Sequence, residues 1–94
     1  MDVVHPGEVL EVEYLLPLKL TQLQLATEIG VPAGRINEII HRKRRVTLDT
    51  ALRLARYFGT TEHFWLDLQT RYDVVFERER IAAALGAIRP ISVS

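Results

Sequence analysis

The chain has 94 residues, of which 48% are hydrophobic and none is cysteine. A chain of this size and composition can form one small folded domain, and the absence of cysteine excludes disulfides and thiolate metal sites. No apolar run is long enough to span a membrane, and no secretory signal is visible. We therefore expect a cytoplasmic protein without a membrane segment. The 12 basic and 12 acidic residues balance, which counts against a nucleic-acid-binding protein only if they are spread evenly along the chain.

The first expected helix begins at a proline and ends before one. Pro6 suits the first helical position because its missing N–H would have no partner there. Pro17 pushes the residue before it out of the helical region of backbone space. The first helix is therefore predicted to stop near Leu15 or Leu16.

Threonines and glycines delimit the later helices. Thr21 and Gln24 have the spacing of a capping box, and Gly30 can take the positive φ that ends a helix. Pro32 is expected to open the next helix. Thr47 and Thr61 are expected to cap two more, and Gly59 to end the first of these. In chain order, the expected helices are residues 6 to 15 or 16, 21–29, 32–40, 47–59 and 61–72.

The C-terminal region gives a weaker pattern. Residues 73–85 either continue the fifth helix or form a sixth, with Ile81 and Leu85 on one face. Residues 86–94 are expected to be extended or disordered, with a strand conceivable only at 91–93. The whole chain is predicted to be a single all-α domain of five or six helices, with a core at 5–72 and an extension at 73–94.

Residues 21–40 carry the strongest functional signal, that of a helix-turn-helix. Two helices that cross steeply through a short turn need a small residue at the crossing, a glycine in the turn and a branched apolar anchor in the second helix. Ala26, Gly30 and Ile36 stand at these positions. The remaining inward positions are also apolar: Leu25, Ile29, Val31 and Ile39. A plain helical bundle is the alternative interpretation of the same pattern.

The outward residues of this hairpin predict contacts to double-stranded DNA. In such motifs the start of the second helix enters the major groove, where arginine pairs with guanine and asparagine with adenine. The predicted base contacts are Ala33, Gly34, Arg35, Asn37 and Glu38. Gln22 and the loop after the hairpin are expected to contact phosphates, and the loop residues are Arg42, Lys43, Arg44 and Arg45.

The charge distribution supports this assignment. Residues 1–34 hold one basic and five acidic residues, residues 35–56 hold seven basic and two acidic, and residues 57–94 hold four basic and five acidic. The basic charge is thus concentrated where DNA is expected to lie. Because one bidentate base contact discriminates by only about 1–3 kcal/mol, we expect a homodimer on an inverted-repeat operator.

Several segments together resemble the HigA-type antitoxins, a group within the Xre/Cro repressor-like helix-turn-helix proteins. They are HPGEVL at 5–10, LTQ at 20–22, RINEI at 35–39, TALRLARYFGT at 50–60 and FWLDLQTRYD at 64–73. The resemblance covers about residues 5–80 and implies a lambda-repressor-like fold. It also implies a transcription regulator that represses its own operon and neutralises a small, basic, mRNA-cleaving RNase toxin. By the same resemblance, the dimer would form through the C-terminal helices, at Phe64, Trp65, Leu68, Tyr72, Ile81 and Leu85.

Other functions fit parts of the same sequence. The chain is compatible with a stand-alone Xre-type repressor without a toxin, or with a protein-interaction module whose helix-turn-helix is only structural. The acidic residues Glu8, Glu11 and Glu13 suit a basic toxin, and equally a solvated helix surface. An enzyme is not expected, because His5, His41 and His63 are scattered and no metal-ligand spacing or phosphate-binding loop occurs, so we predict no cofactor and no metal.

Overall fold

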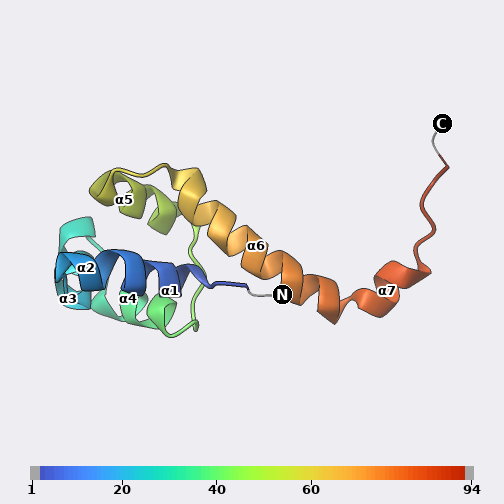
Figure 1. The fold of residues 1–94 in the computed structure, drawn as a ribbon, viewed down its shortest axis with the longest axis horizontal. Coiled ribbons are helices and arrows are strands. Elements are labelled where there is room, and N and C mark those ends of the chain that lie inside the picture. Colours follow the sequence, from blue (N-terminus) through green and yellow to red (C-terminus); the bar gives the residue numbers. More distant parts are fainter. Residues whose placement is uncertain (1–2, 93–94) are drawn as a thin grey trace.

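The computed structural model describes residues 3–92, and its regular structure within that range is entirely helical (Figure 1). In chain order the elements are α1 (Pro6–Val9), the π-helical turn η1 (Leu10–Leu15), α2 (Leu16–Leu18), α3 (Gln22–Ile29), α4 (Ala33–Ile40), α5 (Leu48–Phe58), α6 (Glu62–Arg80) and α7 (Ala82–Ala87). Because α1, η1 and α2 follow one another without a break, they form one continuous helix, and residues 3–92 contain six helices in all. The predicted all-α class is confirmed.

The predicted capping residues act as the sequence indicated. The Thr21 hydroxyl accepts the Gln24 N–H at 3.0 Å, and the Gln24 side chain accepts the Thr21 N–H at 2.8 Å. Thr47 and Thr61 cap α5 and α6 in the same way through their hydroxyls. Gly30 ends α3 with a left-handed φ of 73°, as predicted from its freedom to take positive φ.

The first helix differs from its prediction, because it continues through Pro17 to Leu18. In η1 the hydrogen bonds span five residues, and the Leu16 N–H bonds to the Glu11 carbonyl rather than to that of Val12. This wider turn alters the spacing of the backbone just before the proline ring, and π turns are recognised sites of helix distortion. The helix ends instead at Lys19, which takes a left-handed φ of 53°.

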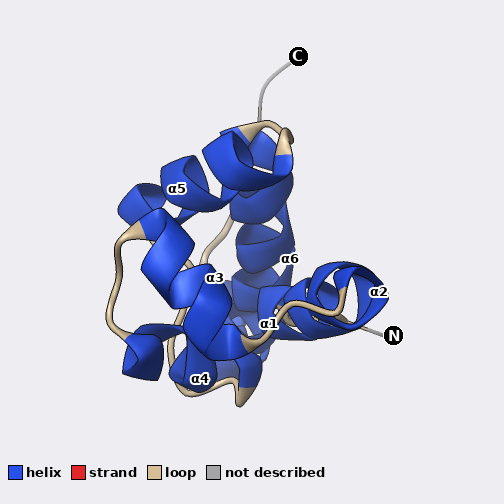
Figure 2. Cartoon of the chain, turned by 90° about the vertical axis from the view of Figure 1, so that its left-hand side faces the viewer, coloured by secondary structure: helices blue, strands red, loops and turns tan. Residues whose placement is uncertain are grey.

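One hydrophobic core holds η1, α3, α4, α5 and the first half of α6 together, and Figure 2 shows these helices packed against one another. Its largest fully buried side chain is Trp65, on the first half of α6. Each of the other elements that surround it contributes at least one fully buried residue, namely Leu10, Leu25, Ile36 and Leu54. The Trp65 indole N–H donates to the Thr60 hydroxyl at 2.8 Å, so its polar atom is satisfied inside the core.

Beyond this core, the second half of α6 and α7 extend away from the other helices, and the whole molecule measures 52 × 26 × 22 Å (Figure 1). The sequence left open whether residues 73–85 continue the fifth helix or form a sixth. In the structure α6 continues to Arg80, and a separate short helix, α7, follows it. Residues 88–92 have no regular structure, and no strand occurs anywhere in 3–92. Val93, part of the conceivable strand, lies outside the described residues. Among the described helices, none is long and apolar enough to cross a bilayer.

His5 joins the first helix to α6. Its ring Nδ1 accepts the Gly7 N–H at 2.9 Å and so caps α1, while the ring lies edge-on to Tyr72 at 4.8 Å between centroids. Burial lowers the pKa of His5 below its usual value of 6.5, and the charge of Arg42 lowers it further, whereas Asp73 opposes both. Protonation would also remove the acceptor that caps α1.

The free energy of unfolding is therefore expected to fall on acidification through His5. A lowered folded-state pKa means that the unfolded chain binds this proton first, so stability is lost as the pH falls below 6.5 toward the folded-state pKa. His5→Asn keeps a capping side chain without the titration. Urea unfolding of both proteins between pH 8 and pH 5 should show the wild type losing more stability than the variant. Parallel pH curves would contradict this.

Candidate nucleic-acid interface

The two helices α3 and α4 form a tight hairpin that is supported from behind by the first helix. Gly30 turns the chain, and the Val31 N–H returns to the Ala26 carbonyl at 3.0 Å. Gly7 of α1 lies directly against α4, since a Cβ added there would overlap the Ile39 carbonyl oxygen and stand 3.0 Å from the Ile40 Cα. The position of α4 is thereby fixed by backbone contact with α1.

The first turn of α4 is flat and exposed. Pro32 precedes it in an extended conformation instead of being its first residue, so the helix begins at Ala33. Gly34 is the second helical residue, has no positive φ, and would bring a Cβ no nearer than 3.9 Å to another side-chain atom, at Glu38. No fold requirement within the described residues explains a glycine there.

Two predicted DNA-contacting residues are brought together across the hairpin. The Asn37 amide donates to the Gln22 side-chain oxygen at 3.1 Å, which joins α4 to the start of α3. Asn37 is exposed, and Gln22 is half-buried. This hydrogen bond therefore joins one predicted base-contacting residue to one predicted phosphate-contacting residue.

The basic loop after α4 is exposed and mostly ion-paired. Arg42 contacts Glu8 of α1 at 3.5 Å, Arg44 contacts Glu38 of α4 at 3.4 Å, and Arg45 contacts Asp73 of α6 at 2.7 Å. Lys43 makes no ion pair within residues 3–92. Pairs this exposed contribute only about 0–1 kcal/mol each, so a phosphate can replace the carboxylate.

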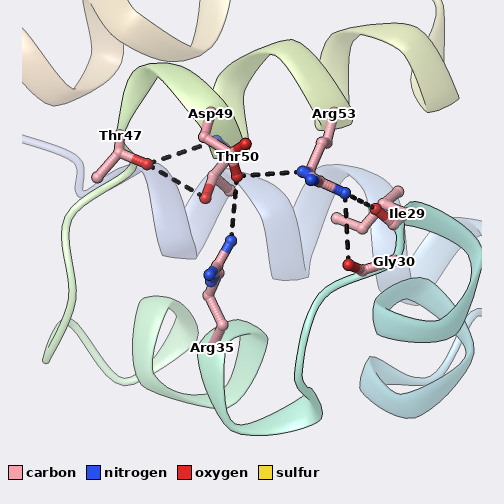
Figure 3. A network of polar contacts seen from close by, with 7 residues as sticks. All are labelled: Ile29, Gly30, Arg35, Thr47, Asp49, Thr50 and Arg53. Atoms are coloured by element: carbon pink, nitrogen blue, oxygen red, sulfur yellow. Dashed lines mark hydrogen bonds and ion pairs between the residues drawn. The ribbon is translucent and has the colours of Figure 1, made fainter.

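Arg35 is part of a network that the sequence did not reveal (Figure 3). Its Nη1 donates to Asp49 Oδ2 at 3.2 Å, and the same oxygen accepts from Arg53 Nε at 3.1 Å. Arg53 Nη1 in turn donates to the carbonyls of Ile29 at 2.8 Å and Gly30 at 3.3 Å. The i,i+4 spacing of Asp49 and Arg53 was visible in the sequence, but their connections to α3 and α4 depend on the fold.

Five of the six residues expected at a dimer interface are at least partly exposed, and one is fully buried. Phe64 and Leu85 are exposed on α6 and α7, and Leu68, Tyr72 and Ile81 are half-buried. Trp65 differs from the expectation, because it points into the core of the single chain with no exposed surface. The resemblance implied an interface position for Trp65, whereas the fold buries its side chain completely within one chain.

The hairpin, its flat first turn and the adjoining basic loop define a helix-turn-helix protein, and residues 13–66 match the helix-turn-helix family. The chain is 45% identical to virulence-associated protein I of Dichelobacter nodosus, over 98% of this chain and 84% of that protein. It is 33% identical to antitoxin HigA-1 of Vibrio cholerae, over 97% and 86% of the two chains.

The Pseudomonas aeruginosa antitoxin HigA, solved with the higBA promoter, superposes on this chain with a TM-score of 0.92 at 32% identity. That similarity covers 97% of this chain and 100% of the other. The chain belongs to the HigA-type antitoxins within the Xre-like helix-turn-helix family.

Proposed function

We propose that this chain binds operator DNA as a dimer through α4, represses its own operon and neutralises a small mRNA-cleaving toxin. The observation that carries the DNA-binding part is the first turn of α4, where Ala33 and Gly34 form an exposed, flat surface. A partner backbone or base edge fits closely against such a surface. The Pseudomonas relative was solved with its higBA promoter, which supports DNA binding by a chain of this fold.

Electrostatics support the same assignment. The exposed loop residues 41–45 lie immediately after α4, where the backbone of a duplex in contact with that helix would run. Each phosphate contact that releases a counterion contributes about −0.9 to the slope of log affinity against log salt. Four such contacts per chain give binding that salt weakens steeply.

Substitutions at Arg35 and Lys43 are expected to have different effects on DNA binding. Arg35→Ala should lower the ratio of affinities for the operator and a scrambled duplex about fivefold or more, because a base contact is lost. Lys43→Gln should weaken both duplexes alike and reduce the salt slope by about 0.9 per contact. Arg89→Gln removes the same charge from the exposed C-terminal tail and should change neither quantity.

The measurement is fluorescence anisotropy of the operator and the scrambled duplex at several salt concentrations. A wild type that binds both duplexes equally would contradict sequence-specific repression and favour a protein-interaction module. Identical effects of Arg35→Ala and Lys43→Gln would contradict the division into base and phosphate contacts.

The C-terminal extension supports dimerisation. Residues beyond the core leave large parts of apolar side chains exposed, among them Phe76, Leu85 and Ile88. A groove of about 440 Å³ also runs between the N-terminal segment and α6, lined by Val4, Leu68 and Val75 among others. A second copy would bury these surfaces and place two α4 helices on two operator half-sites. The particle mass in solution should then be twice 10.8 kDa.

The toxin part of the proposal is supported by family membership and by charge. Glu8 and Glu13 are exposed on the first helix and Glu11 is half-buried there, which gives a basic protein an acidic surface to contact. The test is co-expression with the product of the neighbouring gene. A stable complex and rescued growth are expected, and a neighbouring gene product that is neither toxic nor bound would favour a stand-alone repressor.

A further inference from the structure

Asp49 occupies an unusual position for an acidic residue, because it lies beside the surface proposed to face DNA. It stands in the first turn of α5, just after the basic loop, and more than half of its side-chain surface is exposed. A carboxylate there repels phosphates and lowers the overall affinity for any nucleic acid. Its presence needs a compensating role.

The geometry around Asp49 supplies that role (Figure 3). One carboxylate oxygen accepts from two guanidinium groups, those of Arg35 at 3.2 Å and Arg53 at 3.1 Å. Arg53 is itself held by the carbonyls at the end of α3, so it cannot swing away without breaking those hydrogen bonds. Asp49 is therefore fixed on one side and orients Arg35 on the other.

We propose that Asp49 is a positioning residue for specificity, which holds the Arg35 guanidinium so that it reads a base edge instead of pairing with the nearest phosphate. This inference rests on the proposed function. Bidentate pairing with guanine requires the guanidinium plane and its two donors to lie along one base edge, whereas a phosphate offers its oxygens in several directions and can be paired from many orientations. Arg35 is only 29% exposed on its side chain, in keeping with a restrained group.

The two consequences of removing the Asp49 charge have opposite signs. Asp49→Asn keeps the size and the helix position, and it leaves both arginines without a counter-charge. The affinity for a scrambled duplex should rise, with the salt slope steeper by up to about 0.9 per chain. The ratio of operator to scrambled affinity should fall about tenfold, since one oriented base contact is worth that order of discrimination.

A double-substitution cycle tests whether Asp49 acts through Arg35. In the Arg35→Ala background, Asp49→Asn should no longer change the discrimination ratio, because its target is gone. Asp67→Asn removes an exposed carboxylate from α6 outside the network and is the matched control, with no expected change in the ratio. Thermal unfolding of all variants verifies that each is folded at the temperature of the binding measurement.

Two results would overturn the role of Asp49: an unchanged discrimination ratio, as when both duplexes are weakened equally, or the same loss of discrimination in the Arg35→Ala background. The first would assign Asp49 a purely structural role, and the last would assign it an effect independent of Arg35. A failure of the proposed function looks different, because the wild type itself would then bind operator and scrambled duplex equally.

Discussion

Replacing Gly7 by alanine is expected to lower the free energy of unfolding by about 3 kcal/mol or more. The added Cβ would overlap the Ile39 carbonyl oxygen and lie 2.7 Å from the Ile39 carbonyl carbon. These are backbone atoms in the last turn of α4, so no side-chain rotation relieves the overlap and the two helices must separate. Urea unfolding monitored by circular dichroism measures the loss.

The matched control for this substitution is Gly86→Ala in α7. A Cβ at residue 86 meets nothing within 4 Å, so only helix propensity acts there. Alanine is favoured over glycine in a helix by up to about 1 kcal/mol, which predicts a neutral or slightly stabilised variant. Both glycines are helical, yet the two substitutions should shift stability in opposite directions. A Gly7→Ala protein as stable as the wild type would refute the close approach of α1 to α4.

The second large effect is expected at Trp65. Trp65→Ala should cost about 3–5 kcal/mol, because the side chain is fully buried and its removal leaves a large cavity. Three aromatic rings would lose their central neighbour: Tyr14 at 5.2 Å, Phe58 at 6.2 Å and Phe64 at 5.0 Å between centroids. The Thr60 hydroxyl would also lose the indole N–H that it accepts.

Phe64→Ala is the comparison that separates core from interface. Phe64 is the next residue along α6 but is 38% exposed, so its truncation should destabilise a single chain far less. Chemical denaturation gives the stability of each variant, and sedimentation gives its dimer dissociation constant. Trp65→Ala should mainly lower the free energy of unfolding, and Phe64→Ala should mainly raise the dimer dissociation constant. Comparable losses of unfolding free energy at both positions would show that exposure does not separate the two roles.

Much of the fold was predictable from the sequence because its signals are local. The capping box at Thr21 and Gln24 and the positive φ at Gly30 each depend on a few adjacent residues. The π turn η1 was not predictable, since hydrogen bonds spanning five residues have no residue signature comparable to a cap. Pro17 was consequently taken as the end of a helix that in fact continues past it.

The candidate site was predictable in its location but not in its connections. Spacing placed Arg35 at the start of the recognition helix, but its partner Asp49 lies 14 residues away and is brought near only by the packing of α5. The same holds for Arg45 and Asp73, which are 28 residues apart. Which face of α6 points into the core also depends on tertiary packing, and the resemblance that implied an interface role for Trp65 does not resolve it residue by residue.

The ion pairs of the basic loop have a consequence for how the protein would search a genome. Glu8, Glu38 and Asp73 act as built-in competitors for the positions that phosphates would occupy on the loop. DNA of random sequence would have to displace these carboxylates and would gain only phosphate contacts. Operator DNA would gain base contacts as well. A genome offers roughly 10⁶–10⁹ competing sites, so weak retention at each wrong site matters as much as tight binding at the right one. If the loop binds phosphates as proposed, its ion pairs would thereby weaken retention of the chain on bulk nucleic acid.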